Sequence, residues 1–251
     1  MSAGDGARVM LPDSSAIYLG DAFKLLKFIE PGSVQLVLSD PPYTVSKSNN
    51  FRKSMGRRGL DFGEWDRAFD QFGWLDDAVE ALAPAGAMVI WNDWKLLGFI
   101  AAQLESMGMV VKRQLRWRKK NPFPRNILRT PVQGDEYALW AVKRTGSKCK
   151  GWTFKRRPGY KYERGEFEYP VVQGSSHPTK KPDGLFQDII EMFSKPGDLV
   201  LDPFAGTGTT AVAAQRTGRR HISFELEPSY FKLACDALEQ VVPITHMRKT
   251  L

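Results

Sequence analysis

The chain of 251 residues has few of the side chains that bind metals or form disulfides. Its only cysteines are Cys149 and Cys235, and its only histidines are His177, His221 and His246. Disulfide frameworks need more cysteines, and metal sites need ligands at short, regular spacings. We therefore expect neither disulfides nor a bound metal.

Long apolar runs are also missing. No stretch approaches the roughly 20 apolar residues of a membrane span, and residues 1–9 lack the apolar core of a signal peptide. These absences predict a cytoplasmic protein without membrane contact. The hydrophobic content of 42% and the charged content of 25% are typical of a globular domain, which we expect to span residues 1–251.

Acidic residues are fewer than basic ones, 28 against 36, so the net charge of +8 favours an anionic partner. Two basic stretches, residues 112–129 and 143–164, also contain aromatic side chains. This combination suits phosphate contacts and base stacking. Taken singly, each stretch is equally compatible with a solvated basic surface.

The sequence Asp40-Pro41-Pro42-Tyr43 follows an apolar run, residues 34–38. We predict a buried strand that ends in a rigid corner, because proline fixes φ and removes a backbone donor. The Asp40 carboxylate and the Pro41 carbonyl could accept both N–H groups of a nucleobase amine and localise its lone pair for attack, and Tyr43 could stack on the base. The alternative is a proline-rich turn that Asp40 merely caps.

A second strand-to-turn pattern occupies residues 198–210, where Gly206 and Gly208 allow backbone conformations and close ligand approach that a Cβ forbids. Together with Ala211 they fit the dinucleotide fingerprint. Glu225 ends the next apolar run, where a carboxylate can accept hydrogen bonds from ribose hydroxyls. The pattern favours an adenosine-containing cofactor, and a purely structural glycine turn is the alternative.

In these motifs the chain resembles the amino-group DNA methyltransferases that use S-adenosylmethionine, in the subgroup whose catalytic half precedes the cofactor half. Residues 40–43 match the catalytic tetrapeptide, residues 204–209 match the cofactor loop, and residues 177–182 match a third signature, usually written HPTQKP. Lys180 replaces the common Gln, a surface-compatible change. The resemblance covers nearly all of the chain and is compatible with a homodimer.

The apolar runs predict seven strands, at residues 16–20, 34–39, 87–92, 110–117, 136–142, 199–202 and 221–225. Helical patterns separate several of them, at residues 69–82, 94–107, 182–193, 209–217 and 228–240. Alternating strands and helices indicate an α/β fold with a doubly wound, mostly parallel sheet. The resemblance implies a seven-stranded, Rossmann-like methyltransferase fold in which the last two strands lie beside residues 34–39.

We expect a catalytic half at residues 16–142, a target-recognition insertion at 143–176 and a cofactor-binding half at 177–240. Residues 44–65 are polar and basic, and we interpret them as a loop that closes over the flipped base, or alternatively as a surface insert.

The resemblance implies roles for individual residues. The expected catalytic residues are Asp40, Pro41, Pro42 and Tyr43. The expected S-adenosylmethionine-binding residues are Asp21, Asp40, Thr179, Lys181, Asp202, Phe204, Ala205, Gly206, Thr207, Gly208, Thr209 and Glu225. The expected DNA-binding residues are Lys47, Arg52, Arg57, Arg58, Lys119, Lys120, Arg125, Lys155, Arg156 and Arg157.

Some of these roles have alternatives. Asp21 matches a family position near the cofactor's adenine, but a helix N-cap explains it almost as well. Asp202 could orient the glycine turn or bind the cofactor's ammonium group. Thr179 and Lys181 are candidates for binding its carboxylate.

The implied reaction transfers a methyl group from S-adenosylmethionine to the amino nitrogen of an adenine flipped out of double-stranded DNA. Adenine is favoured because related cytosine enzymes usually begin the tetrapeptide with Ser, and protein-glutamine enzymes with Asn. Cytosine in DNA and adenine in RNA present the same N–H₂ group and remain alternatives. A nicotinamide-dependent oxidoreductase would leave residues 40–43 without a role. A DNA-binding protein without activity is a further alternative.

Overall fold

The computed structural model describes residues 7–43, 69–124, 127–146, 150–172, 180–241 and 248–250, which build one sheet of ten strands. The strands are β1 (Arg8–Met10), β2 (Ala16–Leu19), β3 (Val34–Ser39), β4 (Leu82–Asn92), β5 (Met109–Lys119), β6 (Asp135–Lys143), β7 (Glu166–Tyr169), β8 (Leu199–Asp202), β9 (Arg220–Glu225) and β10 (Arg248–Thr250). The α-helices are α1 (Ala22–Leu25), α3 (Leu75–Ala81), α4 (Leu97–Ser106), α5 (Asp183–Phe193), α6 (Thr209–Arg216) and α7 (Pro228–Glu239), and a 3₁₀ turn, η1 (Leu26–Phe28), follows α1.

The strand order is β10-β1-β2-β9-β8-β3-β4-β6-β5-β7. The five central strands, from β2 to β4 in this order, are parallel, and only β1 and β6 run against the rest of the sheet. This confirms the predicted α/β fold with a mostly parallel, doubly wound sheet. It also places the two last predicted strands, now β8 and β9, in the middle of the sheet, where β8 pairs with β3 and β9 pairs with β8.

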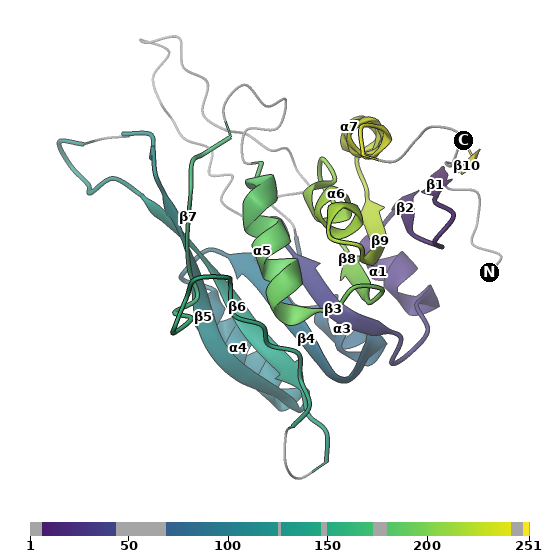
Figure 1. The fold of residues 1–251 in the computed structure, drawn as a ribbon, viewed down its shortest axis with the longest axis horizontal. Helices are drawn as coiled ribbons and strands as arrows, with labels where there is room; N and C mark the ends of the chain where they lie inside the picture. Colours follow the sequence, from purple (N-terminus) through teal and green to yellow (C-terminus); the bar gives the residue numbers. More distant parts are fainter. Residues whose placement is uncertain are drawn as a thin grey trace.

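Helices cover both faces of the sheet, with α5, α6 and α7 on one face and α1, α3 and α4 on the other (Figure 1). The side chains of β4 alternate between these layers, as expected for a period of two residues. Met88 and Ile90 belong to the core cluster under α3 and α4, whereas Val89 and Trp91 pack with α5. All four are completely buried, so both faces of this strand are sealed by apolar contacts.

The predicted strand number is wrong, because the described residues form ten strands rather than seven. The additional strands β1, β7 and β10 have only three or four residues, too few for an alternating apolar pattern to stand out in the sequence. Pairing with neighbouring strands fixes them in the sheet: β7 pairs with the long strand β5, and β1 lies between β2 and β10. Such short strands depend on tertiary contacts rather than on local sequence preference.

Helix α3 is shorter than the predicted helix over residues 69–82. It begins at Leu75, because the Asp70 carboxylate first closes a turn by accepting hydrogen bonds from the N–H groups of Phe72 (2.9 Å) and Gly73 (3.1 Å). Aspartate side chains commonly favour such turns over helix.

The order of the central strands decides where the two motifs meet. Strands β3 and β8 are hydrogen-bonded neighbours, paired through Leu36 with Val200 and Val37 with Leu201. They run in the same direction, so residues 40–43 and the glycine loop after Asp202 emerge at the same edge of the sheet. Open α/β sheets bind ligands at this edge, outside the carboxyl ends of the strands.

Candidate active site

The catalytic tetrapeptide begins where β3 ends, and both carboxylate oxygens of Asp40 have partners. The Tyr43 hydroxyl donates to Oδ1 (2.6 Å), and the Lys181 ammonium donates to Oδ2 (2.5 Å). About a quarter of the Asp40 side chain is exposed. These two partners fix the orientation of the carboxylate. Each carboxylate oxygen has two lone pairs, so Asp40 can still accept a further N–H group.

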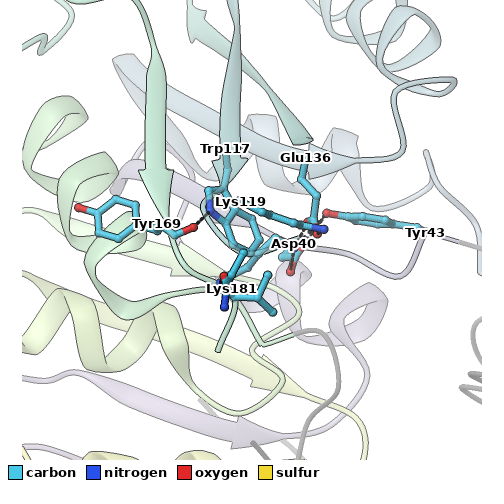
Figure 2. Close-up of polar contacts among 9 residues, drawn as sticks. Asp40, Tyr43, Trp117, Lys119, Glu136, Tyr169 and Lys181 are labelled. Atoms are coloured by element: carbon cyan, nitrogen blue, oxygen red, sulfur yellow. Dashed lines mark hydrogen bonds and ion pairs between the residues drawn. The ribbon is translucent and has the colours of Figure 1, made fainter. Parts of the chain in front are cut away.

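Lys181 is the buried centre of a network of charges whose other members are partly buried (Figure 2). Its ammonium lies 3.1 Å from Oε2 of Glu136, and Oε1 of Glu136 lies 2.7 Å from the ammonium of Lys119. The Lys181 side chain is only 4% exposed and lies over the rings of Tyr43 and Trp91. Burial lowers the pKa of Lys181, but the carboxylates of Asp40 and Glu136 outweigh burial and raise it above its ordinary value.

The tyrosine of the tetrapeptide is held as a neutral hydrogen-bond donor. Burial raises the pKa of Tyr43 well above its ordinary value, and the charges of Asp40 and Glu136 act in the same direction. Its hydroxyl also accepts a hydrogen bond from Lys181 (3.1 Å). Tyr43 therefore orients Asp40 in addition to its predicted role as a stacking surface.

The backbone of the tetrapeptide is fixed by two side chains that the sequence did not point to. The Gln71 amide donates to the Pro42 carbonyl (2.6 Å), and the Asn92 amide donates to the Gln71 side-chain oxygen (2.8 Å). Both amide side chains are buried. A polar residue at the end of an apolar strand, as at Asn92 in β4, is the only local signal that could have suggested this contact.

The second motif forms the predicted glycine turn between β8 and α6. Gly206 and Gly208 have positive φ values of 53° and 80°, which side chains with a Cβ rarely adopt. A Cβ on Gly208 would lie 2.9 Å from the Cβ of Ala234 in α7, so this glycine is also needed for packing. A Cβ on Gly206 would meet nothing within 4 Å, so the loop is open on this side.

Glu225 holds the glycine loop at the end of β9. Its carboxylate accepts hydrogen bonds from the backbone N–H groups of Gly206 (2.7 Å) and Glu227 (2.8 Å). Burial raises the pKa of Glu225 to about 7, although these hydrogen bonds oppose the shift. The predicted ribose contact would therefore be made by a carboxylate that already shapes the loop.

Asp202 lies at the end of β8, where it is 3% exposed and accepts a hydrogen bond from the Phe204 N–H (3.1 Å). Burial raises the pKa of Asp202 to about 7, and the charges of Asp40 and Glu225 add to the shift. Asp202 is therefore repelled by two other carboxylates at the edge formed by β3, β8 and β9. A cationic ligand would relieve this repulsion.

Most of the remaining predicted cofactor residues belong to the loop or to the elements next to it. The Ala205 N–H donates to the carbonyl of Phe224 (2.8 Å), and the ring of Phe204 packs edge-on against Phe69 and Trp74. Asp21 caps α1 by accepting from the Phe23 N–H (3.0 Å), which agrees with the simpler of its two predicted roles. Thr207 and Thr209 are buried at the start of α6, and Thr179 lies outside the described residues.

Comparison with known families shows which family of proteins this chain belongs to. Residues 34–236 match the sequence profile of the N6/N4 DNA methylase family, a range that includes both motifs and the network between them. The chain is a DNA methylase. As a member of this family it is an S-adenosylmethionine-dependent DNA amino-methyltransferase.

Relatives and solved structures agree with this assignment. The Type II methyltransferase M2.DpnII of Streptococcus pneumoniae is 32% identical over 242 residues, which are 87% of each chain. The crystal structure of the M1.HpyAVI–SAM complex is similar with a TM-score of 0.71 and 34% identity, over 88% of this chain and 98% of that one. The cytosine-N4-specific PvuII DNA methyltransferase shares the fold, with a TM-score of 0.66 at 18% identity over 91% of this chain and 89% of that one.

The acidic edge of this DNA methylase suits its cofactor. S-adenosylmethionine carries an ammonium group, a sulfonium and ribose hydroxyls, which match buried carboxylates beside an open glycine loop. Asp202 and Glu225 are the carboxylates that would hold it. Lys181 was a candidate for binding the cofactor carboxylate, and its ammonium contacts Asp40 and Glu136 in this structure.

The predicted DNA-binding residues of the methylase lie in different settings. Arg157 is 10% exposed, pairs with Glu163 at 2.9 and 2.6 Å, and stacks on Tyr160 and Phe167, so it is a structural part of the protein. Arg156 and Lys120 are exposed, whereas Lys119 is engaged with Glu136. Lys47, Arg52, Arg57, Arg58 and Arg125 lie outside the described residues.

Lys155 lies far from the catalytic corner. Its backbone N–H donates to the carbonyl of Met192 (2.8 Å), at the C-terminal end of α5, whereas Lys181 lies just before the N-terminal end of the same helix. A helix of this length spans about 16 Å.

Among the described residues, no helix is long and apolar enough to span a membrane.

Proposed function

We propose that this DNA methylase is site-specific and acts on the exocyclic amino group of an adenine flipped out of double-stranded DNA. The observation that carries the proposal is Asp40, a carboxylate fixed at the end of β3 directly beside the β8 glycine loop. The first residue of the tetrapeptide favours adenine, because the related cytosine enzymes usually have Ser there.

The residues of the corner prepare the amine for reaction. Asp40 accepts one N–H of the adenine amino group, and the Pro41 carbonyl accepts the other, so the nitrogen lone pair is directed away from the ring. The Pro42 carbonyl is already bound to Gln71, which keeps the corner rigid. S-adenosylmethionine supplies an electrophilic methyl group on its sulfonium sulfur. Asp40 or water then takes the proton that the amino group loses.

Target recognition, oligomeric state and location are parts of the same proposal. We infer that residues 143–176 read the DNA sequence and that the protein is a cytoplasmic homodimer. Residues 44–65, which the sequence suggested as a loop over the flipped base, lie outside the described residues. The division into a catalytic half, residues 16–142, and a cofactor-binding half, residues 177–240, belongs to this hypothesis.

The experiment incubates the purified protein with S-adenosylmethionine and plasmid DNA from a methylation-free host, digests the DNA and measures modified nucleosides by mass spectrometry. We expect N6-methyldeoxyadenosine, and none with Asp40→Ala. N4-methyldeoxycytidine as the product would overturn the assignment to adenine, and the absence of any product would overturn the activity.

A further inference from the structure

Glu136 lies in the active site although it belongs to none of the three motifs. We propose that Glu136 is a positioning residue for methyl transfer, which holds Lys181 against Asp40 and balances the lysine charge while Asp40 binds the substrate amine. The inference rests on the proposed function, in which Asp40 accepts that amine.

The contacts form a continuous chain from the sheet to the reacting corner. Glu136 binds Lys119 through Oε1 (2.7 Å) and Lys181 through Oε2 (3.1 Å), and Lys181 binds Asp40 (2.5 Å). The side chains of Lys119 and Glu136 are 16% and 21% exposed, and that of Lys181 is 4% exposed. Water therefore screens these charges little, and each one strongly affects the next.

The sheet fixes Glu136 rigidly. Glu136 is the second residue of β6 and lies opposite Trp117 of β5. Lys119 lies two residues further along β5, on the same face as Trp117. The Trp117 indole N–H donates to the Tyr169 carbonyl of β7 (3.0 Å), which anchors this part of the sheet (Figure 2). Groups placed on strands hold a reacting residue more accurately than groups on loops.

The charges explain why a second carboxylate is needed. Lys181 fixes Asp40, but its positive charge alone would weaken Asp40 as an acceptor and would oppose the positive charge that develops on the methylated nitrogen. Glu136 offsets that charge, and Lys119 in turn offsets Glu136, so two carboxylates face two ammonium groups. While Asp40 accepts the amine, Lys181 keeps Glu136 as a second negatively charged partner.

The ionisation of the network agrees with this role. Burial raises the pKa of Glu136, but Lys181 and Lys119 outweigh burial and hold it below its ordinary value. Glu136 is therefore a carboxylate at neutral pH, as charge balance requires.

The first test compares Glu136→Gln, which keeps the shape and removes the charge, with Glu136→Asp, which keeps the charge. The matched control is Glu168→Gln, because Glu168 is an exposed carboxylate of β7 that pairs with Arg118 (3.5 Å). We expect Glu136→Gln to lower kcat about 10- to 100-fold with an unchanged Kd for S-adenosylmethionine, and Glu136→Asp to recover part of the loss. The control should retain wild-type kcat. A kcat within twofold of wild type for Glu136→Gln would overturn the inference. A rise in the Kd for S-adenosylmethionine as large as the fall in kcat would also overturn it.

The second test is a double-mutant cycle with Lys181→Met. If Glu136 acts through Lys181, adding Glu136→Gln to Lys181→Met should lower kcat less than about twofold further. Multiplying effects would show that Glu136 acts independently of Lys181, which overturns the inference. The wild type is assayed alongside for both methylated bases, which separates this inference from the proposed function. Methylated cytosine alone would refute the adenine assignment, and the cycle would still test Glu136. An inactive wild type would overturn both proposals.

Discussion

Lys181 and Asp40 form an ion pair with 2.5 Å between Nζ and Oδ2, although 141 positions separate them in the chain. The pair joins the segment before α5 to the catalytic corner after β3. Asp40 is therefore oriented before any substrate arrives, which is how enzymes avoid reorganising charged groups during the reaction.

Asp40→Ala should abolish methyl transfer while the Kd for S-adenosylmethionine changes only a few fold, because Asp40 polarises the acceptor amine. Loss of one charge-assisted bond at the reacting centre typically costs about 10²-fold or more in turnover. Single-turnover assays and titration calorimetry measure the two effects. Asp40→Asn is the matched variant, and it should also be strongly impaired because an amide carries no negative charge. Turnover near wild type in a folded Asp40→Ala protein would remove Asp40 from the mechanism.

Glu225→Ala should weaken S-adenosylmethionine binding by about 1 to 3 kcal/mol, because both the predicted ribose contact and the loop contact to Gly206 are lost. Nicotinamide dinucleotides should bind neither form. Titration calorimetry gives both results. Unchanged affinity for S-adenosylmethionine would restrict Glu225 to a structural role.

Asp202→Asn should stabilise the ligand-free protein at alkaline pH. The pKa of Asp202 is about 7 in the fold and 3.8 in the unfolded reference, so between about pH 4 and 7 the folded state binds more protons. The free energy of unfolding therefore falls as pH rises through this window, and the destabilisation is complete above about pH 8. Asparagine removes it, so we expect a gain of about 1 to 4 kcal/mol at pH 8 and little at pH 4.

Denaturant unfolding at both pH values checks this prediction. Ser33→Ala, a change of an exposed hydroxyl, serves as a control without a titrating group. Asp202→Asn should also bind S-adenosylmethionine less tightly, because the ammonium group of the cofactor loses a charged partner. An equal effect on stability at both pH values would contradict the pKa assigned to Asp202.

Arg157 and its neighbour Arg156 should behave differently. Arg157→Ala leaves the Glu163 carboxylate, whose side chain is 2% exposed, without its charged partner, so unfolding should become easier by about 3 kcal/mol. Arg156 is exposed, and Arg156→Ala should change stability by less than about 0.5 kcal/mol. If Arg156 contacts phosphate, its loss should reduce the salt dependence of DNA binding by about one unit of slope. Equal stability of the two variants would contradict the structural role of Arg157.

Local patterns in the sequence predicted the central strands, the catalytic corner and the glycine loop. At β3 an apolar run is followed directly by the proline corner at Asp40, and at β8 an apolar run is followed by the glycine turn and helix α6. In both cases the elements are adjacent in the chain, so the sequence predicts them without tertiary information. The order of β3, β8 and β9 came from the family resemblance, because strands that pair across 160 positions leave no local signal.

The rest of the site depends on contacts between distant segments. Glu136 comes near the corner because β6 pairs with β4. Gln71 contacts the corner through a hydrogen bond to the carbonyl of Pro42, 29 positions earlier in the chain. Arg157 shows the opposite difficulty: its basic and aromatic neighbours suit phosphate binding, yet the same side chains pair within the protein. Composition cannot distinguish a cation that faces DNA from one that is neutralised internally.

The central claim is that Asp40 directs methyl transfer to adenine in DNA. The most direct measurement is long-read sequencing of genomic DNA from a methylation-free host that expresses the wild type or Asp40→Ala. We predict N6-methyladenine at one recurring sequence with the wild type and none with the variant. Methylation of cytosine in place of adenine, or an unchanged adenine pattern with Asp40→Ala, would contradict the claim.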